Sequence, residues 1–185
     1  MRFTTIAVAA TFAAAPLMGQ APPPPTLDTL PRPAARPADV SSVDAIIAAL
    51  YDVISGPAGQ ARDWNRFRSL FVPYARLVPT GVVPNGARAV VLGVEDYIKR
   101  AGPGLEASGF FEIEVNRASE AYGNIAHAFS TYESRRTADR REKPFARGIN
   151  SIQLLRDGAR WWIVTVYWDA ERPGNEIPAK YLPRP

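Results

Sequence analysis

The stretch LLRDGARWWIVTVYWD, Leu154 to Asp169, is the most informative part of this 185-residue sequence. Two runs rich in β-branched and aromatic residues flank the dipeptide Asp157-Gly158. Asp-Gly supplies the positive φ angles that a tight turn between antiparallel strands requires. The stretch therefore predicts a β-hairpin near the end of the chain.

Similar segments precede this hairpin, separated by turn signals at Tyr122-Gly123 and at residues 137–144. Together they predict four strands, at residues 110–123, 124–136, 145–158 and 160–171. Consecutive strands joined by short turns pair in antiparallel fashion. The second half of the domain is thus expected to form an antiparallel meander.

The first half of the domain has helical periodicity. Apolar residues from Val43 to Ile54 recur every three or four positions, which predicts an amphipathic helix that ends before Gly56-Pro57. A second helix, with Leu70 and Phe71 on its apolar side, is expected after Asp63. Short strands are expected at residues 74–79 and 87–92, around the turn GVVPNG. A third helix should begin near Val94 and end at Gly102-Pro103-Gly104. Helices before a meander indicate an α+β domain, with the helices packed on one face of a bent sheet.

The first 38 residues predict export rather than a folded unit. Residues 1–21 contain one basic residue, an apolar run and the triplet Gly19-Gln20-Ala21, the layout of a cleaved signal peptide. Residues 22–38 form a proline-rich linker, so the folded domain is expected over residues 39–185. The apolar run is short for a membrane span, so no membrane association is expected after cleavage. The signal peptide predicts a periplasmic or secreted location. The chain contains no cysteine, so its stability there does not depend on disulfides.

The composition also narrows the classes of partner. Removing Arg2 with the leader leaves 21 basic and 18 acidic residues, a net charge of +3. The basic residues of 135–147 are interleaved with acids, which favours a solvated loop over a nucleic-acid surface. With one histidine and no cysteine, a metal site is not expected, and the absence of nucleotide-binding motifs predicts no cofactor.

The helix pattern, the segment DWNRFRSLF, the helix start GVEDYIK and the final hairpin together resemble the NTF2-like superfamily, also called SnoaL-like or cystatin-like. The most specific element is DG-x-x-W-x-I, matched by Asp157, Gly158, Trp161 and Ile163. The resemblance implies a conical sheet around a pocket, often in a homodimer. Members include isomerases, dehydratases, cyclases, epoxide hydrolases and binding domains without chemistry, so the fold does not by itself give the function.

His127 is the weak candidate for a catalytic residue, because it is the chain's only histidine. Dehydratases of this superfamily rely on more than one histidine, which counts against that activity. Alternation places His127 on one strand face with Phe129 and Thr131, and the larger side chains of that face suggest that it lines the pocket. A structural role for a half-buried histidine remains the alternative. The acids Asp52, Asp63, Glu95 and Asp96 are poor candidates for a catalytic base, and Asp63 and Asp96 are better explained as helix caps.

Aromatic residues and one amide complete the predicted binding site. Apolar walls with a few polar groups are typical of small-molecule pockets. Asn150 lies between two isoleucines, so its amide either ties strands together or faces a ligand. The predicted ligand-binding residues are Trp64, Phe67, Tyr97, His127, Phe129, Asn150 and Trp168.

Three functions follow as hypotheses. The first is an exported domain that binds a small apolar or aromatic molecule without catalysis. The second is an enzyme of the isomerase, cyclase or hydratase type that uses His127 for proton transfer. The third is a homodimeric scaffold, which requires a filled cone and an apolar patch on its outside.

Overall fold

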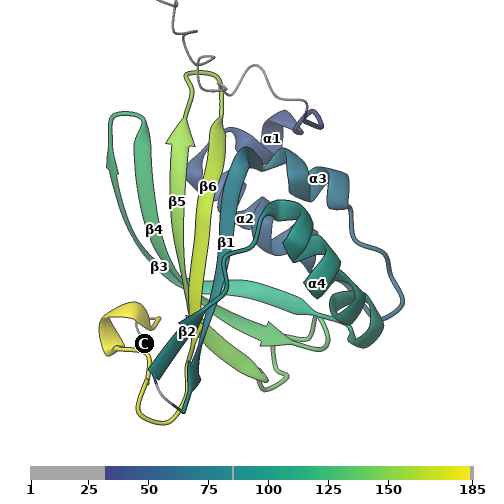
Figure 1. Cartoon of the computed structure of the whole chain (residues 1–185), viewed down its shortest axis with the longest axis vertical. Helices are drawn as coiled ribbons and strands as arrows, with labels where there is room; N and C mark the ends of the chain where they lie inside the picture. The colour runs from purple at the N-terminus through teal and green to yellow at the C-terminus, as the bar shows by residue number, and fades with distance from the viewer. Residues whose placement is uncertain (1–31, 85, 184–185) are drawn as a thin grey trace, which may run out of the picture.

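The computed structural model describes residues 32–84 and 86–183 (Figure 1). The predicted signal peptide, most of the linker and Asn85 of the GVVPNG turn lie outside these ranges. Six strands form one curved sheet in the order β2-β1-β6-β5-β4-β3. The strands are β1 (Phe71–Val83), β2 (Gly86–Ala89), β3 (Phe111–Tyr122), β4 (Ile125–Arg135), β5 (Ala146–Arg156) and β6 (Trp161–Ala170).

The meander β3-β4-β5-β6 is antiparallel, as predicted. The sheet as a whole is mixed, because β1 pairs in parallel with β6, for example Leu77 with Val166. β1 is also longer than the predicted strand at 74–79 and begins at Phe71, which the sequence placed in a helix. The amide of Ile163 donates to the carbonyl of Leu70, so pairing with β6 extends the strand at this end.

The helices cover one face of the sheet (Figure 1). They are α1 (Pro37–Val40), α2 (Val43–Ile54), α3 (Trp64–Ser69) and α4 (Val94–Ser108). The 3-10 helix η2 (Ala179–Tyr181) lies on the opposite face, where Tyr181 packs against Phe129. The predicted start of the domain, Asp39, lies inside α1. Asp63 accepts the amide of Arg66, and Asp96 accepts the amide of Gly93, so both carboxylates are the helix caps that the sequence predicts. None of the described helices is both long and apolar enough to cross a membrane.

The predicted end of α4 at Gly102-Pro103-Gly104 is wrong, because the helix continues through this tripeptide to Ser108. Tertiary contacts override the local stop signal. A side chain at Gly102 would bring its Cβ within 3.1 Å of the Trp64 ring, so glycine permits close packing against α3. Beyond Pro103, Glu106 accepts hydrogen bonds from the Trp64 indole and the amide of Gly59. These contacts hold the last turn in place despite the backbone donor that proline lacks.

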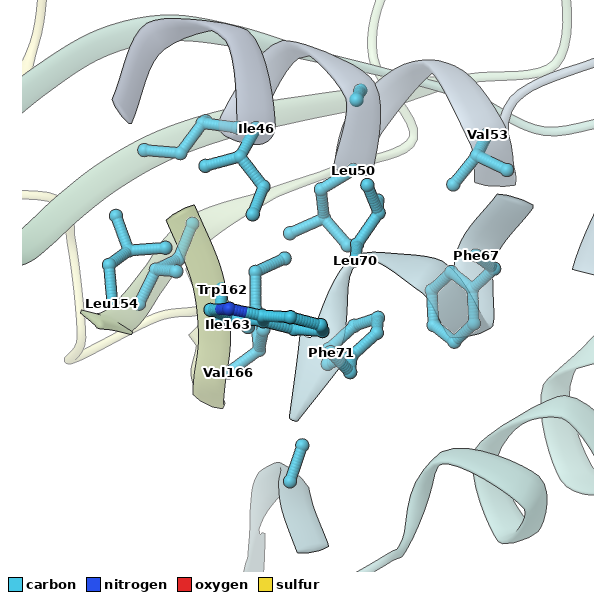
Figure 2. Packing of buried hydrophobic residues seen from close by; sticks show 14 of the residues in the cluster. Ile46, Leu50, Val53, Phe67, Leu70, Phe71, Leu154, Trp162, Ile163 and Val166 are labelled. Atoms are coloured by element: carbon cyan, nitrogen blue, oxygen red, sulfur yellow. The ribbon is translucent and has the colours of Figure 1, made fainter. Parts of the chain in front are cut away.

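The core lies between α2 and the inner face of the sheet. Figure 2 shows Ile46, Leu50 and Val53 of α2 directed toward the side chains of β1 and β6, including Phe71 and Trp162. Trp162 is 1% exposed, and its indole donates to Asp157 at the predicted hairpin turn. Full burial of such side chains stabilises the fold by about 1.5–3 kcal/mol each.

Arg62 joins the ends of two helices. Its side chain is buried, and its guanidinium donates only to backbone carbonyls, among them Ile54 at the end of α2 and Leu105 in α4. The other acceptors are the carbonyls of Gly56, Pro57 and Gln60. A side chain at Gly56 would collide with the guanidinium, its Cβ lying 2.7 Å from Nη1. Arg62 therefore acts as a clamp that fixes α2 relative to α4.

Arg62→Ala is expected to lower the free energy of unfolding by about 3 kcal/mol or more, because several buried carbonyls lose their donor. Urea denaturation of the domain measures this loss. The matched control is Arg141→Ala, since the Arg141 side chain is 91% exposed and its removal should leave the midpoint unchanged. Equal midpoints for the two variants would contradict the clamp.

Candidate functional site

The inner face of the sheet, together with α2, α3 and α4, encloses a cavity of about 290 Å³. Its walls are predominantly apolar and aromatic. Most polar side chains at the cavity come from three neighbouring strands: Glu112 from β3, Tyr132 and Ser134 from β4, and Asn150 from β5. Tyr97 of α4 adds a further hydroxyl group. The remaining lining residues are Leu50, Ile54, Phe67, Leu77, Tyr97, Ala101, Leu105, Phe110, Phe145, Ala146, Val166 and Trp168.

Glu112 is the one carboxylic acid among the cavity-lining residues. Ser134 Oγ donates to its Oε2 at 2.9 Å, and Asn150 Nδ2 lies 3.4 Å from its Oε1. Burial raises the pKa of Glu112 to about 7, and the two hydrogen bonds oppose that rise. A carboxyl group with this pKa exchanges its proton readily near neutral pH.

Two tyrosine hydroxyl groups at the cavity have no hydrogen-bond partner within residues 32–84 and 86–183. They belong to Tyr97 of α4 and Tyr132 of β4. Burial, and secondarily the charge of Glu112, raise the pKa of both, so both are neutral donors at physiological pH. The Tyr132 hydroxyl packs against Gly148, where an added Cβ would approach it to 2.5 Å. Glycine at this position therefore makes room for the phenol.

Four of the predicted ligand-binding residues line this cavity: Phe67, Tyr97, Asn150 and Trp168. Phe67 and Tyr97 are stacked with ring centroids 5.4 Å apart, and Tyr97 meets Trp168 edge-on at 6.3 Å. Trp64 is not part of the lining. It packs against the edge of Phe67 at 5.6 Å and bonds to Glu106.

His127 and Phe129 lie on the opposite face of the sheet. The cavity of about 290 Å³ is lined by Tyr132 and Ser134 of the other face of β4, whereas Phe129 borders a separate pocket of about 320 Å³ on the His127 face. His127 borders a depression on the outer surface, where its Nδ1 lies 3.3 Å from Gln153 Nε2. Phe129 packs against Tyr181 of η2, with ring centroids 5.3 Å apart.

The weak acidic candidates also lie outside the cavity lining. Asp52 pairs with Arg66, and Glu95 pairs with Arg68. Together with the two capping aspartates, these acids have structural partners. Within the described part of the chain, no three His, Asp or Glu side chains are grouped so that they could hold a metal ion.

Sequence reasoning missed Glu112, Tyr132 and Ser134. The available signal was their register across two strands: Glu112 pairs with Ser134, and Glu114 pairs with Tyr132. Residues paired across two strands share one face of the sheet, so each acid lies on the same face as its partner on β4.

The fold and the cavity define an α+β cone with a partly open, mostly apolar pocket. No known family matches the sequence, and no curated protein matches it. Solved structures do match its fold. An NTF2-like protein from Pseudomonas putida is 12% identical with a TM-score of 0.53, over 78% of this chain and 95% of that one.

Two other solved structures are similar to a comparable extent. A Mycobacterium tuberculosis protein is 12% identical with a TM-score of 0.55, over 74% of this chain and 75% of its own. The structure of LinA is 9% identical with a TM-score of 0.54, over 78% of this chain and 92% of that one. The chain therefore has the NTF2-like, cystatin-like fold that its sequence predicted.

The raised pKa of Glu112 predicts how stability depends on pH. An unfolded glutamate loses its proton near its ordinary value of 4.5, whereas the folded chain holds it to about pH 7. The folded state thus binds more protons between these values, and stability falls as pH rises through this window. The loss is about 3 kcal/mol, from a pKa difference of roughly 2.5 at 1.36 kcal/mol each.

Glu112→Gln removes this titration, so its stability relative to the unchanged protein should increase by about 3 kcal/mol between pH 4.5 and pH 8. Urea denaturation of both proteins at the two pH values measures the change. A constant difference between the two proteins would mean that Glu112 has an ordinary pKa.

Proposed function

We propose that this protein binds a small, mostly apolar or aromatic molecule inside the cone. The observation that supports it best is the cavity of about 290 Å³, which joins apolar walls to a few convergent polar groups. A scaffold with a filled cone has no need of such a space. The volume is at the lower end for ligand pockets, which suits a molecule of one or two rings.

The polar groups of the cavity suggest what the ligand carries. Tyr97 and Tyr132 offer neutral hydroxyl donors that lack partners among the described residues. A hydroxyl donor at the cavity surface gains a hydrogen bond when the ligand brings an acceptor. We therefore propose a ligand with a carbonyl, ether or hydroxyl oxygen on an otherwise apolar body.

A second candidate function is proton transfer, and the position of Glu112 favours it. A carboxyl group with a pKa of about 7 acts as a general base or acid at neutral pH. The tyrosine hydroxyls of the same cavity are donors for an oxygen that gains negative charge. This arrangement fits an isomerase or related enzyme that uses Glu112, instead of His127 as the sequence suggested.

Export and self-association are further parts of the proposal. The layout of residues 1–21 supports cleavage and release into the periplasm or the medium. Exposed apolar side chains on the sheet, Tyr122, Ile125 and Tyr167, support a homodimer formed through its outer face.

Filling the cavity should weaken binding. Ala101 of α4 lines the cavity, so Ala101→Phe is expected to weaken binding of the bicyclic ketone 2-tetralone by roughly tenfold or more. Isothermal titration calorimetry measures the affinity. The matched control is Ala118→Phe on an exposed part of β3, which should leave the affinity unchanged. Equal affinities for both variants would place the binding site elsewhere.

Proton transfer is tested without knowledge of the natural substrate. The protein is expected to accelerate exchange of the α-protons of 2-tetralone with D2O, and Glu112→Gln should reduce this acceleration by about 100-fold or more. Mass spectrometry measures the deuterium incorporated. His127→Ala should retain the full rate. Exchange lost in His127→Ala but kept in Glu112→Gln would restore the histidine hypothesis.

A further inference from the structure

A chain of hydrogen bonds runs from the cavity under α2 to the edge of the sheet. Asn150 Nδ2 lies 3.0 Å from the hydroxyl of Tyr51, which lies 2.6 Å from Ser130 Oγ. Ser130 Oγ is in turn 2.6 Å from Oε1 of Glu114. Ser130 is fully buried, and Tyr51 and Asn150 are 5% and 6% exposed, so water does not interrupt the chain.

The chain ends in an ion pair. Arg117 donates to both carboxylate oxygens of Glu114, at 2.8 and 2.7 Å, and its remaining terminal nitrogen donates to Asp44 of α2 at 2.6 Å. A carboxylate held in this two-pronged way by arginine is ionised and only accepts hydrogen bonds.

The ionised end determines the direction of every hydrogen bond along the chain. Because Glu114 only accepts, Ser130 must use its single proton to donate to it. The oxygen of Ser130 is then left to accept the proton of Tyr51, and the oxygen of Tyr51 is left to accept from Asn150. The group of Asn150 that faces Tyr51 is therefore the amide nitrogen, which is also the atom 3.4 Å from Glu112.

We infer that the Arg117–Glu114 ion pair, acting through Ser130 and Tyr51, orients the amide of Asn150 so that an N–H and not the oxygen faces Glu112. Ser130, Tyr51 and Arg117 are thus positioning residues for the carboxyl group of the cavity. The inference deepens the proposed function, because it concerns the protonation of the same acid.

No charged group faces Glu112 among the described residues, so the orientation of the Asn150 amide has a direct effect on the protonation of Glu112. The titratable groups that face it from α2, α4 and β4 are Tyr51, Tyr97 and Tyr132, and burial raises the pKa of all three. They are neutral near pH 7. The charged groups at the far end of the hydrogen-bond chain are Glu114, Arg117 and Asp44. Ser130 separates them from Asn150 and Glu112. A donor that faces Glu112 stabilises its ionised form, whereas an amide oxygen would stabilise the protonated form.

The test is the titration of the Glu112 carboxyl group, followed by carbon-13 NMR in the full domain without ligand. Ser130→Ala removes the acceptor of Tyr51, whose proton can then turn to the oxygen of a rotated Asn150 amide. The titration midpoint of Glu112 is expected to rise by about one pH unit or more. Ser151→Ala, next to Asn150 in sequence but on the opposite face of β5, is the matched control and should not change the midpoint.

Arg117→Met tests the far end of the chain and does not alter a fully buried residue. It removes both hydrogen bonds that hold the Glu114 carboxylate in place, so Glu114 no longer fixes the direction of the Ser130 hydroxyl and the Glu112 midpoint should again rise. In the Ser130→Ala background, Arg117→Met should add little, because its effect passes through Ser130. Additive effects of the two changes, or an unchanged midpoint in Ser130→Ala, would overturn the inference.

The proposed function fails independently of this inference. If Glu112 titrates near 4.5 in the unchanged protein, the acid–base proposal is contradicted. The difference in the Glu112 titration midpoint between the unchanged protein and Ser130→Ala still decides whether the hydrogen-bond chain orients Asn150.

Discussion

The guanidinium of Arg62 holds the helical half of the molecule together. It is a buried charge whose acceptors are all carbonyl oxygens, and two of them lie at or near the C-terminal ends of α2 and α4. Carbonyls at these ends carry partial negative charge, which compensates a buried cation. Since α2 supplies Leu50 and Ile54 to the cavity lining and α4 supplies Tyr97, this one side chain sets the distance between two walls of the cavity.

Burial of the Glu112 carboxyl group between these walls costs free energy. Removing an acid from water favours its protonated form, and the hydrogen bonds from Ser134 and Asn150 only partly offset this effect. A group with both protonation states accessible is of little use for stability, but it is well suited to hold or move a proton. The cavity thus combines apolar walls with one group that can hold or release a proton near neutral pH.

Much of the fold could be predicted because its signals are local. Asp157 accepts the amides of Ala159 and Arg160 within the hairpin, so the turn depends on adjacent residues alone. The end of α4 was mispredicted because Gly102 makes room for Trp64, a contact between residues 38 positions apart that no local rule contains. The parallel pairing of β1 with β6 was not predicted either, because it joins strands that are far apart in the sequence.

The site was predicted only in part. Aromatic type and the isolated amide were sufficient to identify four residues that line the cavity: Phe67, Tyr97, Asn150 and Trp168. The pocket was expected on the face of β4 that carries the larger side chains. The small residues Ala126 and Ala128 of the other face are the buried ones and form part of the core. Glu112 was missed because apolar residues alternate with it along β3, and alternation alone does not reveal which face is inside. The C-terminal helix η2 contacts β3 and β4, so part of the outer face of the sheet is covered as well.

The central claim is that the functional pocket is the interior of the cone around Glu112 and not the outer face that carries His127. A chemical-shift titration of isotope-labelled protein with 2-tetralone tests it most directly, with the Glu112 carboxyl and the His127 ring as reporters. The account predicts that added ketone moves the Glu112 carboxyl and Trp168 indole signals in a saturable way, while the His127 ring signals stay in place. Saturable movement of the His127 ring signals, with the Glu112 carboxyl unchanged, would contradict it.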